Sequence, residues 1–207
     1  LDAIRRMAYL QIDTINVINR SPYLVLWSRL GDYPISWLDE LLAEGALFEY
    51  WAHAMCFVPI EEYPLYRRRM LDGEKDFGFP LKWAVRWSRE NPETMQRVRT
   101  HLLENGPVRS ADFESKDGRP AGGWWNWKEE KNALEAMLFT GEVMIARRQN
   151  FQRVYDLRER VLPGWDDSAL PSGDATRNQV TLQAVRALGV AFPAWVAAYF
   201  QLPKTGI

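Results

Sequence analysis

Two polar residues interrupt an apolar stretch near the start of the chain. Gln11 and Asp13 flank Ile12 within residues 10–16. In an extended strand, residues two apart share one face, so the amide and the carboxylate would project side by side while Ile12 points into the core. An amide beside a carboxylate can position a water molecule and stabilise a developing positive charge. Gln11 and Asp13 are therefore the candidate catalytic pair.

The same pair also has a purely structural interpretation. Gln11 could simply end a strand, and Asp13 could cap a helix, since Asp-Thr is a good helix start. So short a pattern has many chance matches, and for the residues taken alone the structural interpretation is the commoner one. The residues themselves leave both alternatives open.

The elements around this pair predict an α+β fold that is mainly helical. Residues 1–8 have a helical pattern, 9–13 an extended one, and further helices are expected within 14–30 and from Ser36. Two apolar runs, 46–51 and 54–58, would then form a hairpin with a tight turn at Ala52-His53. Helices followed by a two-stranded hairpin are typical of a winged helix, a helix-turn-helix with a β wing.

A similar order of patterns recurs later in the chain. Asn91-Pro92 is a good helix start, a second short helix follows Pro107, and a third is expected at 127–139. Strands at 142–146 and 151–157 would then enclose a basic hairpin tip at 147–150. The predicted domains are a first winged helix with an incomplete N-terminus (1–58), a helical connector (59–90), a second winged helix (91–157), a linker (158–173) and the incomplete start of a third winged helix (174–207).

Composition restricts the kinds of site that this chain can build. Its 207 residues are 47% hydrophobic and 26% charged, which is typical of an ordinary soluble globular protein. One cysteine and two histidines exclude an intrachain disulfide, a Cys-based zinc site and a multi-His metal site. No apolar run reaches membrane-spanning length and no signal peptide is visible, so we expect a cytoplasmic protein without membrane contact.

The charges give only permissive evidence for a nucleic-acid partner. The net charge of −1 argues mildly against one. Arginines are nevertheless grouped at 67–69 and at Arg147-Arg148, although such runs are usually solvated faces. Arg147, Arg148, Lys128 and Lys131 could contact phosphates. The clustered Trp124 and Trp125 could stack or intercalate, but tryptophans more often fill a core.

Five motifs follow one another in order along nearly the whole chain. They are Gln11-Ile-Asp13-Thr-Ile-Asn16, Leu26-Trp-Ser-Arg-Leu-Gly31, Phe48-Glu-Tyr-Trp51 with His53, Gly123-Trp-Trp-Asn-Trp127, and Gly141-Glu-Val-Met-Ile-Ala-Arg-Arg148 with Phe151-Gln-Arg-Val-Tyr155. Together they resemble the YcaQ-like crosslink-repair DNA glycosylases. The resemblance implies tandem winged helices followed by a C-terminal β-barrel, and the chain looks like a fragment without the barrel and the extreme N-terminus.

The resemblance implies a fold that needs no metal or other cofactor, and we expect a nucleoid-associated monomer. The resemblance also implies a reaction. It is hydrolysis of the N-glycosidic bond of an N7-alkylated purine, including interstrand crosslinks, on double-stranded DNA with alkylated or crosslinked guanine. The family signature is Gln, an apolar residue, then Gln or Asp; Gln11-Ile12-Asp13 fits the Asp form, which the resemblance associates with bacterial enzymes of broad tolerance. An N7-alkylated base is cationic and leaves without a general acid, so an oxocarbenium-like sugar and a water remain. Asp13 would stabilise that cation and activate the water, which Gln11 would also hold.

The DNA-binding residues are predicted less directly than the catalytic pair. The resemblance suggests that His53, on the first wing, faces the lesion, whereas a hairpin histidine without a function is the alternative. The full set of predicted DNA-binding residues is Arg20, Trp51, His53, Trp124, Trp125, Lys128, Arg147 and Arg148.

Two other functions fit the predicted architecture. A non-catalytic winged-helix transcription regulator would have the same helices and basic wings, but it would not need the polar pair. A protein-interaction scaffold could instead dock partners through Trp-rich faces. Abasic-site formation on DNA that contains N7-methylguanine would separate the enzyme from the regulator, and salt-insensitive failure to retain duplex DNA would favour the scaffold.

Overall fold

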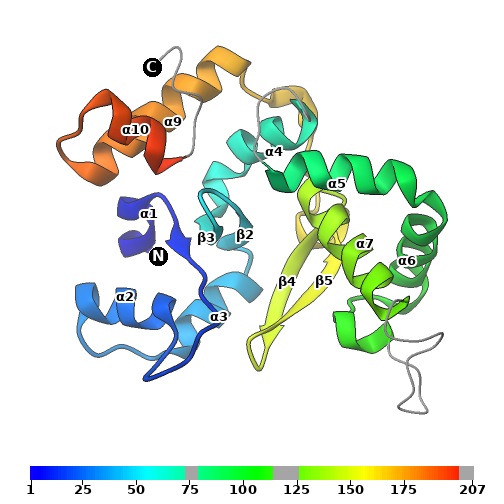
Figure 1. Ribbon diagram of the computed structural model, residues 1–207. Coiled ribbons are helices and arrows are strands. Elements are labelled where there is room, and N and C mark those ends of the chain that lie inside the picture. The colour runs from blue at the N-terminus through cyan, green and yellow to red at the C-terminus, as the bar shows by residue number, and fades with distance from the viewer. Residues whose placement is uncertain (73–78, 114–125, 201–207) are drawn as a thin grey trace. The chain divides into compact units, whose positions relative to one another are not determined.

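The computed structural model describes residues 1–72, 79–113 and 126–200. These residues are mainly helical, with two small antiparallel sheets, in agreement with the predicted α+β class. They belong to two compact units (Figure 1). The first unit contains residues 1–69 and 167–207, and the second contains residues 70–166.

The first unit begins with a helix, a short strand, two helices and a hairpin. Ala8, whose φ is 64°, is the left-handed C-cap of the first helix, and the first strand begins two residues later at Leu10. Arg20 is the N-cap of the second helix and Pro22 lies in its first turn, so the helix that was expected within residues 14–30 begins at Ser21. The elements are α1 (Asp2–Met7), β1 (Leu10–Gln11), α2 (Ser21–Leu30), α3 (Ser36–Ala43), β2 (Leu47–Trp51) and β3 (Met55–Pro59).

The three strands form an antiparallel sheet in the order β1-β3-β2. Gln11 lies opposite Cys56 across the β1–β3 pair, and Phe48 lies opposite Val58 across the β2–β3 pair. The Phe48 ring packs edge-on against Tyr63 at a centroid distance of 5.3 Å. This arrangement confirms the predicted hairpin and gives β1 a buried, hydrogen-bonded neighbour.

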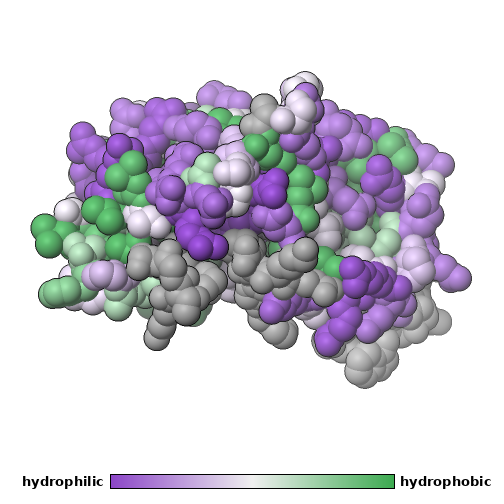
Figure 2. All heavy atoms as spheres, turned by 90° about the horizontal axis from the view of Figure 1, so that it is seen from above, coloured by the Kyte–Doolittle hydropathy of each residue, from purple (hydrophilic) through white to green (hydrophobic). Residues whose placement is uncertain are grey.

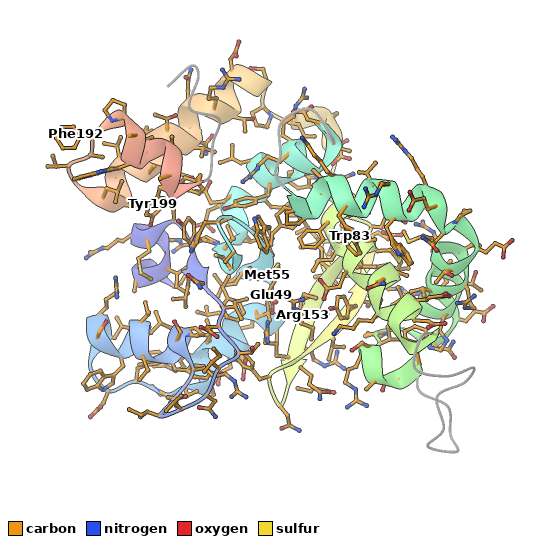
Figure 3. The ribbon with its side chains drawn as sticks, in the orientation of Figure 1. Glu49, Met55, Trp83, Arg153, Phe192 and Tyr199 are labelled. Carbon is orange, nitrogen blue, oxygen red and sulfur yellow. The ribbon has the colours of Figure 1, made fainter. Side chains whose placement is uncertain are left out.

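The remainder of the first unit is helical. After the sheet come η1 (Ile60–Glu62) and α4 (Tyr63–Asp72), which begins in this unit; later in the chain come η4 (Asp167–Ala169), α9 (Gly173–Leu188) and α10 (Pro193–Tyr199). The hydroxyl of Tyr9 donates to the backbone carbonyl of Tyr199 at 2.7 Å, and the hydroxyl of Tyr199 donates to the carbonyl of Met7 at 2.6 Å. Tyr199 lies on the side of α10 that faces α1 (Figure 3). Residues 173–200 therefore pack on the start of the chain.

The arginines at 67–69 are not the compact positive surface that the sequence suggested. Arg67 is buried and forms a bidentate ion pair with Asp167, in which Nη2 lies 2.7 Å from Oδ2. Arg69 is buried too, with its guanidinium 5.5 Å from the centre of the Tyr66 ring, and burial lowers its pKa. Tertiary packing has turned two of the three cations into structural groups.

The second unit contains three longer helices and a second hairpin. Its elements are α5 (Phe79–Glu90), α6 (Pro92–Asn105), η3 (Ser110–Phe113), α7 (Asn126–Thr140), β4 (Val143–Gln149), β5 (Gln152–Leu157) and α8 (Arg158–Val161). Helix α6 begins at Pro92, as predicted from Asn91-Pro92, and Gly106 is its C-cap. Val98, Leu134 and Met137 are fully buried and form part of the core. Val108 also pairs with Tyr155, which adds one bridge to the β4–β5 ladder.

The second hairpin is longer than predicted. A bulge between Ile145 and Arg147 shifts the register, and pairing then continues to Gln149 and Gln152. The tip consists of Asn150 and Phe151, with φ values of 51° and 66°. Positive φ at both positions is the conformation of a two-residue hairpin turn. The expected tip at 147–150 was therefore wrong, because Arg147 and Arg148 lie within β4.

Apolar surface remains exposed in the first unit around the turn between α9 and α10. Val190, Phe192 and Trp195 are all exposed there, and Figure 2 shows apolar side chains gathered over this part of the chain (green, left). Among the described residues, no single helix is long and apolar enough to cross a membrane. Taken together, α9 and α10 have sufficient length and apolar composition, but they meet at a bend of 103°.

Candidate functional site

The candidate catalytic pair lies at the end of β1, in the first unit. Gln11 is exposed, Ile12 is buried and Asp13 is half-buried. The backbone N–H of Ile12 donates to the carbonyl of Met55 at 2.8 Å, so strand-like pairing extends one residue beyond β1. The alternation of exposure along residues 11–13 is that of a strand with one buried face, as the sequence suggested.

Gln11 is held by a side chain from the adjacent hairpin. The Nε2 atom of His53 lies 2.9 Å from Oε1 of Gln11. An amide oxygen can only accept, so Nε2 of His53 carries the proton and donates it. The imidazole also packs beside Tyr9, with ring centroids 5.0 Å apart, and burial lowers the pKa of His53. A lowered pKa favours the neutral ring at neutral pH.

Asp13 caps a turn and not a helix. Its Oδ1 accepts a hydrogen bond from the backbone N–H of Ile15 at 2.9 Å, whereas α2 begins only at Ser21. Its Oδ2 accepts none from the residues that the structure describes. The helix-capping interpretation of Asp13 is thus wrong, and the carboxylate keeps one oxygen available while the other holds the chain that follows.

That following chain is a loop that the sequence did not suggest. In residues 14–20, three large apolar side chains are exposed: Ile15, Val17 and Ile18 are 68%, 88% and 90% exposed. Asn16 forms a β-bridge with Arg20, and the side-chain oxygen of Asn19 accepts from the N–H of Arg20 at 2.8 Å. The loop is therefore tied at its start by Asp13 and at its end by the residue before α2.

The other predicted DNA-binding residues of the first unit lie near the same strands. Trp51 ends β2 opposite Met55 and is half-buried, and His53 lies in the turn that follows. Arg20 is half-buried at the N-cap of α2. Cys56, opposite Gln11, is completely buried, and burial raises the pKa of its thiol to about 12. It is therefore not a candidate nucleophile.

The two arginines predicted at the second hairpin differ from one another. Arg147 is exposed on β4. Arg148 is only 9% exposed; its Nη1 donates to the carbonyl of Phe151 at 2.5 Å, and its guanidinium lies 4.3 Å from the centre of the Phe151 ring. Arg147 can reach a phosphate, whereas Arg148 holds the hairpin turn together.

Some predicted residues fall outside the part that the structure describes. Trp124 and Trp125 belong to residues 114–125, which are not described, and Lys128 lies in α7 without a described side chain. Lys131, one turn further along α7, is exposed. Within the described residues, no group of three His, Cys, Asp or Glu side chains could hold a metal ion.

Sequence comparison assigns the chain to a family. The model of the family described as DNA glycosylase AlkZ-like matches residues 4–207. This match covers both units and confirms the family that the five motifs indicated. The comparison with solved structures gave no match. The chain belongs to the AlkZ-like family of DNA glycosylases.

Proposed function

We propose that this protein is a monofunctional DNA glycosylase that hydrolyses the N-glycosidic bond of N7-alkylated purines, including purines joined in interstrand crosslinks. The observation that carries the proposal is the arrangement at the end of β1. Gln11 and Asp13 lie on either side of buried Ile12, and His53 fixes the amide of Gln11. This places an oriented amide and a carboxylate on one exposed edge.

The residue types suit this reaction. Alkylation at N7 leaves the purine positively charged, so the bond from the sugar C1′ to N9 breaks with both electrons going to the base. The sugar then resembles an oxocarbenium ion. Asp13 stabilises that charge through its carboxylate, and a water adds to C1′ and gives up its proton to Asp13 or to solvent. Because the leaving base is already activated, this scheme requires no general acid.

His53 acts as a positioning residue in this scheme. By donating from Nε2 to the amide oxygen of Gln11, it fixes which end of the amide faces outward. The NH₂ group of Gln11 is then the end that faces the reacting water. A neutral imidazole, favoured by burial, adds no positive charge beside the sugar cation.

The order of elements supports tandem winged helices. The first unit has α1, β1, α2, α3 and the β2–β3 hairpin; the second has α6, the Val108 bridge, η3, α7 and the β4–β5 hairpin. We therefore propose winged helices at 1–58 and 91–157, joined by 59–90, with 158–173 leading to the start of a third at 174–207. Arg20, Trp51 and Lys128 are proposed DNA contacts, together with Arg147 and, where they are accessible, Trp124 and Trp125.

The charge of α3 argues against the alternative, a regulator that reads DNA. In helix-turn-helix regulators the second helix of the motif enters the major groove and carries the base and phosphate contacts. Here the corresponding helix, α3, contains Asp39 and Glu40, is followed by Glu44, and has no lysine or arginine. Carboxylates there would repel phosphates, so DNA contact is expected from the hairpins and from the edge that carries Gln11.

Incubation with a duplex that contains one N7-methylguanine tests this function. We expect release of free N7-methylguanine, detected by mass spectrometry, and an abasic site that hot alkali converts into a strand break. The matched duplex with unmodified guanine should stay intact, and a duplex with a crosslink between two N7 atoms tests the wider substrate claim. Retention of the methylated duplex without base release would show a binding protein instead and overturn the proposal.

A further inference from the structure

The loop between β1 and α2 exposes an unusual amount of apolar surface. Ile15, Val17 and Ile18 are each more than two-thirds exposed within four consecutive positions. Large apolar side chains on an exposed loop, grouped in this way, typically mark a surface that contacts something else. The loop directly follows Asp13, so its partner must lie beside the candidate site.

The loop is also held in place before anything binds. Asp13 accepts from the N–H of Ile15, Asn16 bridges to Arg20, and the ends of the loop continue into the β1–β3 pairing and into α2. Preorganisation of this kind lowers the entropy cost of binding. The loop is thus held by hydrogen bonds near both of its ends, while its three apolar side chains are exposed.

Distance limits connect the loop to the reaction. An extended chain spans about 3.3–3.6 Å per residue, so Ile15 lies within about 7 Å of Asp13 and Ile18 within about 18 Å, measured between Cα atoms. Base pairs in DNA are spaced by about 3.4 Å. A nucleotide whose sugar reaches Asp13 therefore has neighbouring base steps within reach of these side chains.

The residues that separate the apolar side chains suit a nucleic-acid partner. Thr14, Asn16 and Asn19 are neutral hydrogen-bonding residues, Arg20 is a cation, and residues 14–20 contain no acid. Nothing in this loop would repel phosphates. Proteins that bend DNA often insert Ile, Leu, Phe or similar side chains between base steps and partly unstack them.

We propose that Val17 and Ile18, supported by Ile15, insert into the base stack next to the damaged nucleotide. The inserted side chains unstack that step and present the sugar C1′ to Gln11 and Asp13. This inference rests on the proposed glycosylase function and adds the device by which a duplex is opened at the site. Asp13 links the two roles, because one carboxylate oxygen holds the loop while the other faces the reaction.

The test compares a loop variant with a matched control. The loop variant is Val17→Ser with Ile18→Ser; because both side chains are exposed, it should melt at the temperature of the wild type. The control is Val190→Ser, which removes a valine that is 86% exposed in the turn between α9 and α10. Each protein is mixed with a duplex that carries 2-aminopurine beside N7-methylguanine, and single-turnover excision is measured on that duplex and on the single strand alone.

We expect the wild type and the control to raise the 2-aminopurine fluorescence as the neighbouring base unstacks. The loop variant should lose most of that rise and excise from duplex DNA about tenfold more slowly or worse, while excision from the single strand stays within about twofold. Val17→Ile with Ile18→Val, which keeps two apolar side chains, should restore both duplex signals.

Two results would overturn the inference. One is a loop variant that matches the wild type in duplex excision and fluorescence, which would indicate that the apolar loop binds a protein partner instead of DNA. The other is equal loss on duplex and single strand, which would mean that the loop only supports Asp13. If the wild type excises nothing, the proposed function fails. The insertion is then still tested by whether the wild type raises the 2-aminopurine fluorescence and the loop variant does not.

Discussion

Replacement of Asp13 by Asn tests the charge of this side chain separately from its role in the turn after β1. An Asn side chain has nearly the same shape and keeps an oxygen that can accept the hydrogen bond from the N–H of Ile15. The turn after β1 should therefore survive, and the main change is the loss of one negative charge. Asp13→Ala, by contrast, removes both the charge and the hydrogen bond.

The magnitude follows from the half-buried position of the carboxylate. Two unit charges about 4 Å apart attract by about 1 kcal/mol in bulk water and by about 4 kcal/mol near a protein surface. Asp13 lies between these limits, because it is neither fully exposed nor enclosed. At about 1.4 kcal/mol for each factor of ten, the excision rate should fall by about 5-fold to 700-fold.

Single-turnover release of N7-methylguanine from a duplex measures this effect, and fluorescence anisotropy at the same salt concentration measures DNA affinity. Asp13→Asn should leave the affinity nearly unchanged. Asp174→Asn, which removes an exposed carboxylate at the start of α9, is the matched control and should excise as the wild type does. An Asp13→Asn protein that excises within twofold of the wild type would refute electrostatic stabilisation by this residue.

Three further predictions concern stability. Tyr199→Phe removes the hydrogen bond to the carbonyl of Met7, so the free energy of unfolding should fall by about 1 kcal/mol; an unchanged denaturation midpoint would contradict this. Arg160→Met removes the guanidinium that donates at 2.7 Å to the carbonyl of Leu102 in the last turn of α6. This change should cost about 1–3 kcal/mol, and hydrogen exchange should speed up in that turn and not in α9. Burial lowers the pKa of His53, so the folded protein takes up this proton less readily than the unfolded chain, whose histidines titrate near about 6.5. The contribution of His53 to the free energy of unfolding is therefore fully present above that pH, and it is lost as the pH falls through the lower pKa of the folded state. In a His53→Gln variant the melting temperature should fall less as the pH is lowered, and an equal fall in both proteins would contradict this.

Local periodicity was sufficient to predict much of the fold. Proline in the first turn and glycine at the end defined α6, and pairs of apolar runs identified both hairpins. Alternation alone was also enough to assign Gln11 to an exposed face and Ile12 to the core. These features depend on neighbours within a few residues, which is what a sequence pattern records.

The failures occurred where the structure depends on distant contacts. Ile15 and Ile18 look like packing residues, yet the hydrogen bonds of Asp13 and Arg20 hold them in solvent. A bulge in β4 moved the hairpin tip beyond Arg148, and no local signal marks it. Gln11 and His53 are 42 positions apart in the chain, and only the pairing of β1 with β3 brings them together.

The hydrogen bonds between α10 and the residues around β1 have a consequence for biosynthesis. Tyr9 and Tyr199 join the start of the chain to α10 through hydrogen bonds. The unit that bears the candidate catalytic strand therefore consists of two separate stretches of sequence, and residues 70–166 are inserted between them. Domains generally fold as units while the ribosome is still adding residues. The inserted unit can close as soon as it emerges, whereas the hydrogen bonds of Tyr9 and Met7 with α10 can form only after Tyr199 has been synthesised. The first unit is therefore completed only after α10 has left the ribosome.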